Sequence, residues 1–312
     1  AGSGGLSFAL GGSAGASGDG GDVSLANSGL IYTEGAGANG LTAQSIGGGG
    51  GIAGLASDVD FGENDGVWSV DIGGQDSSGS GGEITLANSE TIVTKGNNAF
   101  GILAQSIGGG GGTGSLALGE MAGSLNSLAL GVGGSTSAPS DGGDITFTAS
   151  SGEIGTEGNL ASALVVQSIG GGGGIVTVSS QTGFDVSDGV SLALGGTGGE
   201  GGDGGDITLT QTADILTTGD GAHGILLQSI GGGGGYIALD NQGGNSTITG
   251  LQLGGFANGN GGDIVFTLDA DVQTTGDASV GVVVQSIGGG GGFVTSLGSD
   301  VDAAVLSGTG TG

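Results

Sequence analysis

The sequence predicts an all-β fold, a β-solenoid built from five repeats of about 61 residues, and three observations support this prediction. The string QSIGGGGG occurs five times, and its glutamines are 61, 62, 61 and 57 residues apart. Short segments of β-forming residues recur at fixed distances from each string and are bounded by glycine, asparagine and aspartate. Glycine contributes 86 of 312 residues and interrupts every candidate helical window. Strands repeating at a fixed long period are typical of solenoids, whose repeats bury their apolar faces against one another.

Two further markers recur with the same period. A Gly-Gly-acid motif places its acid at Asp22, Glu83, Asp144, Asp206 and Asp263. An Ile/Val-x-Thr-x-Gly motif places its threonine at Thr33, Thr94, Thr156, Thr217 and Thr274. The markers indicate a single repeat domain over residues 1–312, with units at about 1–51, 52–112, 113–174, 175–235 and 236–292 and a partial unit at 293–312.

Each unit is expected to contain five short strands. In one unit they cover residues 191–196, in the return segment, then 207–210, the Ile-x-Thr segment, 224–230 and 236–239. A unit of this length has two possible geometries: about three ordinary solenoid turns, or one wide layer of five strands. The segment that leads into each glutamine is apolar on both faces, as in a strand covered on both sides. This favours the wide layer, and the predicted architecture is a stack of wide multi-strand layers with stacked glycine tracts.

The recurring glutamines and glycines are interpreted as structural. A buried amide needs hydrogen-bond partners, and like copies stacked about 4.8 Å apart can supply them as an amide ladder. Glycine tracts let neighbouring backbones approach closely; a flexible loop, a phosphate cradle and a ligand-binding glutamine are the alternatives. We expect register-fixing structural ladders at two sets of residues: Gln44, Gln105, Gln167, Gln228 and Gln285, and Thr33, Thr94, Thr156, Thr217 and Thr274.

The charge balance excludes several classes of partner. Thirty acidic residues face one lysine and no arginine, for a net charge of −29, which disfavours nucleic acid and anionic membranes. No run is long and apolar enough to span a bilayer, so no direct membrane insertion is expected. The low share of charged residues, 10%, argues against simple disorder. There is no cysteine, hence no disulfide.

No cofactor is expected, with calcium as an alternative. Residues 201–206 match the first six positions of the calcium-binding nonapeptide G-G-x-G-x-D, but Thr208 stands where an apolar residue should follow. The motif also lacks the tandem spacing of nine that a calcium roll requires. We expect solvated acids, whose mutual repulsion in a stacked column would weaken with added salt.

Catalysis has little support in the sequence, which predicts that the protein is not an enzyme. The one histidine, His223, corresponds to Asn39, Phe100, Ser162 and Val280 in the other units, as a variable turn residue would. Carboxylate pairs for glycoside cleavage do not stand out from the repeated background. A solenoid enzyme acting on polysaccharide is kept as an alternative.

The string TTGDGAHGILLQSIGGGGG at residues 217–235 resembles the glycine-rich repeats of very large autotransporter-type passenger proteins of alphaproteobacteria. The resemblance covers essentially the whole chain. It implies an exported β-solenoid at the bacterial cell surface, with adhesive or structural duties.

We therefore expect a non-enzymatic, extracellular structural β-solenoid, serving as a surface stalk, matrix element or filament. Its expected partner is itself, by end-to-end or lateral stacking. The alternative is an adhesin whose variable return loops bind a host or surface receptor or glycan.

Overall fold

The fold of this chain is known from a computed structural model. It describes residues 6–11, 18–57, 66–74, 78–118, 125–134, 138–180, 186, 188–196, 201–242, 244, 247–255, 258–298, 300–301 and 304–305. These residues form strands and turns and contain no helix. The expected all-β repeat fold is confirmed.

Each repeat contributes one strand to each of five parallel sheets, which we number I to V along the repeat. Sheet I follows the Gly-Gly-acid motif and contains β2 (Val23–Asn27), β7 (Ile84–Asn88), β12 (Ile145–Ala149), β17 (Ile207–Gln211) and β22 (Ile264–Leu268). Sheet II holds the threonine motif, in β3 (Ile31–Thr33), β8 (Ile92–Thr94), β13 (Glu153–Thr156), β18 (Asp214–Thr217) and β23 (Val272–Thr274). Sheet III ends in Gln-Ser-Ile and contains β4 (Leu41–Ile46), β9 (Ile102–Ile107), β14 (Leu164–Ile169), β19 (Ile225–Ile230) and β24 (Val282–Ile287).

The last two sheets follow the glycine pentads. Sheet IV contains β5 (Gly50–Ser57), β10 (Gly111–Leu118), β15 (Gly173–Ser180), β20 (Gly234–Asp240) and β25 (Gly291–Leu297). Sheet V lies in the return segment and contains β1 (Leu6–Leu10), β6 (Gly66–Ile72), β11 (Leu125–Val132), β16 (Val190–Leu194), β21 (Thr247–Leu253), β26 (Asp300–Val301) and β27 (Ala304–Val305).

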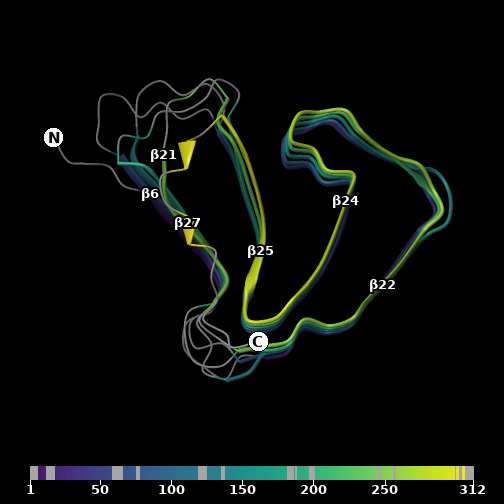
Figure 1. The fold of residues 1–312 in the computed structure, drawn as a ribbon, viewed down its shortest axis with the longest axis horizontal. Coiled ribbons are helices and arrows are strands. Elements are labelled where there is room, and N and C mark those ends of the chain that lie inside the picture. Colours follow the sequence, from purple (N-terminus) through teal and green to yellow (C-terminus); the bar gives the residue numbers. More distant parts are fainter. Residues whose placement is uncertain are drawn as a thin grey trace.

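One repeat makes one wide layer, and like residues of successive repeats lie opposite each other. Gln167 pairs with Gln105 on one side and with Gln228 on the other. The five layers overlie one another when the molecule is viewed along the stack (Figure 1). Of the two geometries that the sequence left open, the structure adopts the wide layer, with a rise of about 4.8 Å between strands.

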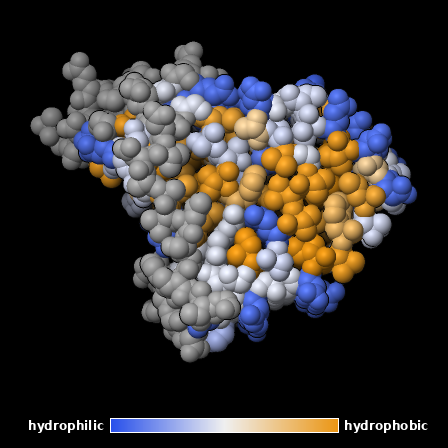
Figure 2. Space-filling model, viewed as in Figure 1, coloured by the Kyte–Doolittle hydropathy of each residue, from blue (hydrophilic) through white to orange (hydrophobic). Residues whose placement is uncertain are grey.

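The two ends of the stack expose side chains that the inner layers bury. Ile225 and Leu227 in β19 are fully buried, whereas their partners Val282 and Val284 in the last layer are 37% and 45% exposed. Figure 2, which looks onto the last layer, shows apolar atoms over the part of that layer formed by β22 and β24.

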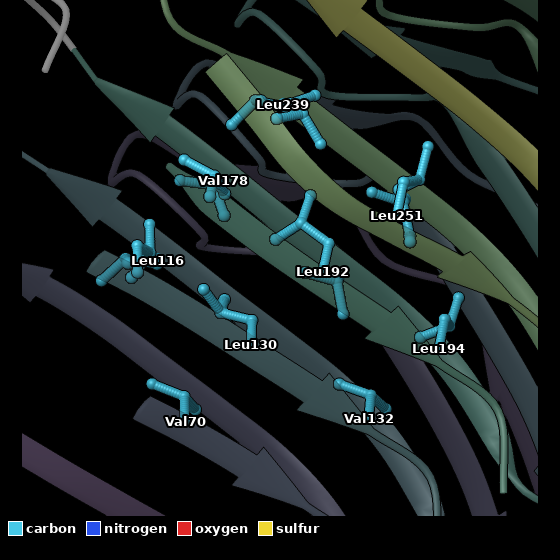
Figure 3. Close-up of a cluster of buried hydrophobic side chains, with 14 of the residues drawn as sticks. Val70, Leu116, Leu130, Val132, Val178, Leu192, Leu194, Leu239 and Leu251 are labelled. Atoms are coloured by element: carbon cyan, nitrogen blue, oxygen red, sulfur yellow. The ribbon is translucent and has the colours of Figure 1, made fainter. Parts of the chain in front are cut away.

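Among the described residues, three large apolar cores and one small one run along the stack, the small one being the column of the Gln-Ser-Ile isoleucines around Ile169. The first lies between sheets IV and V, where Leu116, Val178 and Leu239 face Leu130 and Leu192 (Figure 3). The second is enclosed by sheets I, II and III, and the third lies between sheets III and IV. Sheet III is therefore covered on both faces, since Leu164 points into the second core and Val165 into the third. This is why its segments are apolar throughout.

A turn between sheets II and III closes the third core. In every layer one residue of this turn has a left-handed backbone, with φ between 54° and 67°: Gly37, Asn98, Leu160, Gly221 and Ala278. The turn contacts sheet IV, because the Asn98 side chain donates a hydrogen bond to Ser179 Oγ at 2.7 Å.

Candidate functional site

The five glutamines form a continuous chain of side-chain hydrogen bonds along the stack. Each Nε2 donates to the Oε1 of the glutamine in the next layer, at 2.5, 2.7, 2.7 and 2.8 Å from first to last. Gln105, Gln167 and Gln228 are fully buried. Gln167 and Gln228 also donate from Nε2 to sheet IV, to the Gly174 and Gly235 carbonyl oxygens at 3.4 and 3.3 Å, whereas Gln105 Oε1 accepts from Thr113 Oγ1 of that sheet at 2.8 Å. The amide ladder thus joins layers along the stack and sheets III and IV within a layer.

The threonines do not form a ladder, and this expectation was wrong. Thr94 Oγ1 donates to the Ala99 carbonyl oxygen at 2.6 Å, and Thr217 Oγ1 to that of Ala222 at 2.7 Å. Thr33 and Thr156 bond the carbonyl five residues on in the same way; Thr274 occupies the equivalent place in β23. Each of these hydroxyls closes its own turn, so the threonines hold the turn that covers the third core.

Each glycine pentad has a backbone that only glycine adopts readily. The second and third glycines have φ between 75° and 96°, and the fourth and fifth between 133° and 157°, in all five layers. A Cβ on Gly173 would overlap the Gly234 carbonyl oxygen in the next layer. A Cβ on Gly174 would overlap the Gly112 carbonyl oxygen in the preceding layer. The pentads are hydrogen-bonded backbone, and in the inner layers side chains are excluded on both sides.

Three glycine segments meet at what we call the glycine junction. Around the fourth pentad these are the pentad itself, Gly202 ahead of the acid of the same layer, and Gly254–Gly255 after strand β21 of the fifth layer. Gly255 N–H donates to the Gly232 carbonyl oxygen, and Gly232 N–H donates to that of Gly202, both at 3.0 Å. The bond from the second pentad glycine recurs in all five layers. The junction therefore joins the segment before sheet I, the pentad after sheet III and the segment after sheet V through backbone hydrogen bonds alone.

The serine of Gln-Ser-Ile braces this junction, a role that sequence reasoning missed. Ser168 Oγ donates to the Gly143 carbonyl oxygen of its own layer and accepts from Gly205 N–H of the next, both at 2.8 Å. The same pair of bonds is made by Ser45, Ser106 and Ser229. A Cβ on Gly142 would overlap this hydroxyl, which explains the first glycine of the Gly-Gly-acid motif. The nearly constant distance between the acid and the glutamine, 22 residues in four repeats and 23 in one, was the signal available in the sequence.

The acids of the Gly-Gly-acid motif stack in one column on the surface. Asp144 Oδ1 accepts the Asp206 N–H, and Asp206 Oδ1 accepts the Asp263 N–H, each at 2.8 Å. Asp22 does the same for Glu83 at 3.0 Å. These carboxylates bind the N–H groups that immediately precede β7, β17 and β22 of sheet I. Among the described residues no three acidic or histidine side chains gather as a metal-binding group.

His223 is fully buried in the third core, a placement that its variable sequence position did not indicate. Its Nδ1 accepts the Val280 N–H at 3.0 Å, so the ring proton is on Nε2, which lies 2.7 Å from Thr295 Oγ1. The ring meets Tyr236 and Phe293 edge-on, with centroids 5.8 and 5.0 Å away. Burial lowers the pKa of His223 to about 4 and raises that of Tyr236 to about 12. The imidazole is neutral and enclosed, a packing role rather than a solvent-accessible base.

The one lysine, Lys95, lies between an acid of the next layer and an aromatic ring of the preceding one. Lys95 Nζ is 3.4 Å from Glu157 Oε1 in the next layer and 5.7 Å from the centre of the Tyr32 ring in the preceding one. These side chains are exposed, so the pair contributes little to stability.

Comparisons with protein-family models, with curated proteins and with solved structures return no match to this chain. In the part of the chain that the structure describes, no helix has the length and hydropathy of a membrane span.

Proposed function

We infer that this protein is a non-enzymatic structural element, a rigid β-solenoid that works outside the cell as a stalk or matrix component. The observation that carries this inference is the constant register of five layers, held by the amide ladder and the glycine junction. A stack of this kind gains length in one direction with each added repeat, at unchanged width. A spacer or scaffold needs that property.

The location rests on the resemblance to autotransporter-type passenger repeats and on composition. A net charge of −29 suits a chain that is exposed to solvent, and without cysteine the fold depends on no disulfide. The adhesin alternative depends on the return loops, which lie largely outside the described residues, and no observed feature favours it.

The first test is a change of length. An array with five extra copies of residues 106–167, joined so that Gln167 is again followed by serine, should lengthen by about 24 Å at constant width. Solution X-ray scattering measures both dimensions. Growth in all dimensions, or loss of the folded state, would overturn the structural proposal.

The second test addresses location and activity. Antibodies raised against the purified chain should label intact cells of the organism that makes it, and external protease should remove the label. Labelling only after permeabilisation would contradict the extracellular proposal. Release of sugars from surface polysaccharide by the purified chain, lost when carboxylates are replaced, would identify an enzyme instead.

A further inference from the structure

We propose that the outer face of sheet I binds ice, through two columns of threonine side chains whose spacing matches a lattice of water molecules. The proposal goes beyond the structural role inferred above and does not rest on it, because it uses only the outward side chains of one sheet.

The outer face of sheet I is a regular array of small side chains. Alternate residues of each strand point away from the second core, and like positions of successive layers lie opposite one another. Thr146, for example, lies opposite Thr85 on one side and Thr208 on the other. The two columns are Ser24, Thr85, Thr146, Thr208 and Val265, and Ala26, Ala87, Thr148, Thr210 and Thr267. All of these side chains are exposed except Thr210, which is half-buried.

Sheet I is also flat, which is unusual for a sheet of five strands. A usual twist of about 20° between neighbouring strands would rotate the last of five strands by about 80° from the first. The strands that lie behind β22 instead overlie one another in the view along the stack (Figure 1). The threonines of the array therefore keep one orientation, about 4.8 Å apart along the stack and about 6.7 Å apart along each strand.

The six threonine hydroxyls of this face are available to a ligand. None of them makes a hydrogen bond to another residue in the part of the chain that the structure describes, whereas Thr94 in sheet II bonds its own turn. The branched Cβ of threonine restricts its side chain, which presents a methyl group beside a hydroxyl that both donates and accepts. The face thus holds hydroxyl and methyl groups at fixed, repeating positions.

The periodicity of the array points to the ligand. A small soluble molecule would meet one or two of these threonines, whereas a crystal surface with the same repeat meets all of them at once, and the weak contacts add. The oxygen lattice of hexagonal ice repeats along two perpendicular directions at distances close to the two threonine spacings. The hydroxyls can occupy positions of that lattice, and the methyl groups restrict the orientation of the water beside them.

The charge and composition of the face argue against other occupants. All ten outward side chains are uncharged, in a chain of net charge −29. Asp144 and Asp206 belong to the acid column that borders the face, so a second copy laid on it would bring two such columns together. Ice carries no charge. Phe147 and Phe266 pack into the second core, which leaves no aromatic ring on the face to stack on sugar units.

The test measures thermal hysteresis, the gap between the melting and freezing temperatures of a single ice crystal, and the adsorption of fluorescently labelled protein to ice. The 312-residue chain should produce faceted crystals and a measurable gap. Thr208→Tyr places a ring in the middle of the array and holds ice away from the neighbouring threonines, so hysteresis at equal concentration should fall at least about tenfold. Thr146→Lys should have the same effect through a flexible side chain.

Ser191→Tyr is the matched control. Ser191 is exposed in β16 of sheet V, so the substitution adds the same ring to the outer face of a different sheet and should leave hysteresis unchanged. Equal thermal unfolding temperatures of the variants show that each of them folds.

The array with five extra copies of residues 106–167 adds Thr146 and Thr148 in every new layer and should adsorb more strongly than the 312-residue chain.

Three results would overturn the proposal. One is the absence of hysteresis and of adsorption to ice by the folded chain, and another is an equal loss in Thr208→Tyr and Ser191→Tyr. The third is binding of this face to crystalline cellulose or to a second copy, lost in Thr208→Tyr, without binding to ice. The length and surface-labelling tests of the structural role do not depend on these results.

Discussion

The glycine junction and the third core lie within the same layers but are built in opposite ways. At the junction glycine stands at every position of the pentad in all five layers, and the carbonyl that each pentad meets ahead of the acid comes from glycine in four layers and from Ser140 in the third. In the third core one column reads Ile52, Thr113, Ile175, Tyr236 and Phe293, and side chains of very different size occupy equivalent places.

The difference follows from the kind of atoms in contact, which are backbone atoms at the junction and side-chain atoms in the third core. At the junction, main chain meets main chain at hydrogen-bond distance, and in an inner layer a Cβ on Gly170, Gly173 or Gly174 would enter a neighbouring carbonyl. In the third core, side chains fill a space that the turn between sheets II and III closes, so a large residue in one layer is accommodated by its neighbours. Repetition is strict where backbones touch and relaxed where side chains do.

Substitution inside a pentad should have the largest effect. Gly173→Ala places a methyl group against the Gly234 carbonyl and forces a non-glycine residue to φ 141°. We expect a loss of about 4 kcal/mol or more in the free energy of unfolding, measured by chemical denaturation. Gly54→Ala is the control, because a Cβ there meets nothing within 4 Å. Equal stability of the two variants would mean that the pentads tolerate side chains.

Gln167→Leu should have the next largest effect. It removes the middle of the amide ladder and leaves Gln105 Nε2 without its acceptor and Gln228 Oε1 without its donor, both buried. A loss of about 3 kcal/mol is expected, with reduced hydrogen-exchange protection in β14. The same change at Gln285, in the partly exposed last layer, should cost much less. Unchanged protection in β14 would show that the ladder does not hold the register.

The third core should make stability depend on pH through His223. Its pKa falls from 6.5 to about 4 on folding, so the unfolded chain binds the extra proton and stability is lost as pH falls from about 6.5 towards 4. By pH 5 this amounts to about 2 kcal/mol. His223→Phe, which introduces the residue found at position 100, should remove this part of the slope. The carboxylates are common to both proteins, so their contribution drops out when the free energies of unfolding of the two proteins are subtracted at each pH. Identical dependence on pH in the two proteins would contradict the burial of a neutral imidazole.

The turn that covers the third core offers a smaller, stabilising change. Ala278 has φ 54°, which glycine adopts without strain, and its side chain is exposed. Ala278→Gly should therefore raise the free energy of unfolding by about 0.5 to 1 kcal/mol. Leu160→Gly, at the same turn position, should instead destabilise because the Leu160 side chain is buried. Thermal unfolding of both variants tests the opposite signs.

Sequence reasoning reached the architecture because the period and the strand pattern carry it. The segments before the glutamines are apolar on both faces, and only a strand between two cores requires that. The threonines misled, because a recurring polar residue bonds its own turn as readily as its copy in the next layer.

The junction itself could not be predicted in detail. Ser168 meets Gly143 and Gly205, which are 25 and 37 residues away, and no local pattern specifies which distant segments come together. The burial of His223 could not be predicted for a related reason. The residue type at its position varies between repeats, and the side chains that pack against it, Thr295 and Phe293, belong to another sheet.

One irregularity shows how such a stack accommodates an inserted residue. The third repeat carries one residue more than the others between its acid and its glutamine, and Gly152, at φ 85°, accommodates it in the turn between β12 and β13 (Figure 1). The register of sheet II is restored at Ile154, opposite Ile92, and nothing beyond it shifts. An insertion in one repeat is thus absorbed where it occurs. Surface turns of this protein are free to diverge in length, while every layer remains interchangeable with the next at the ladder and the junction.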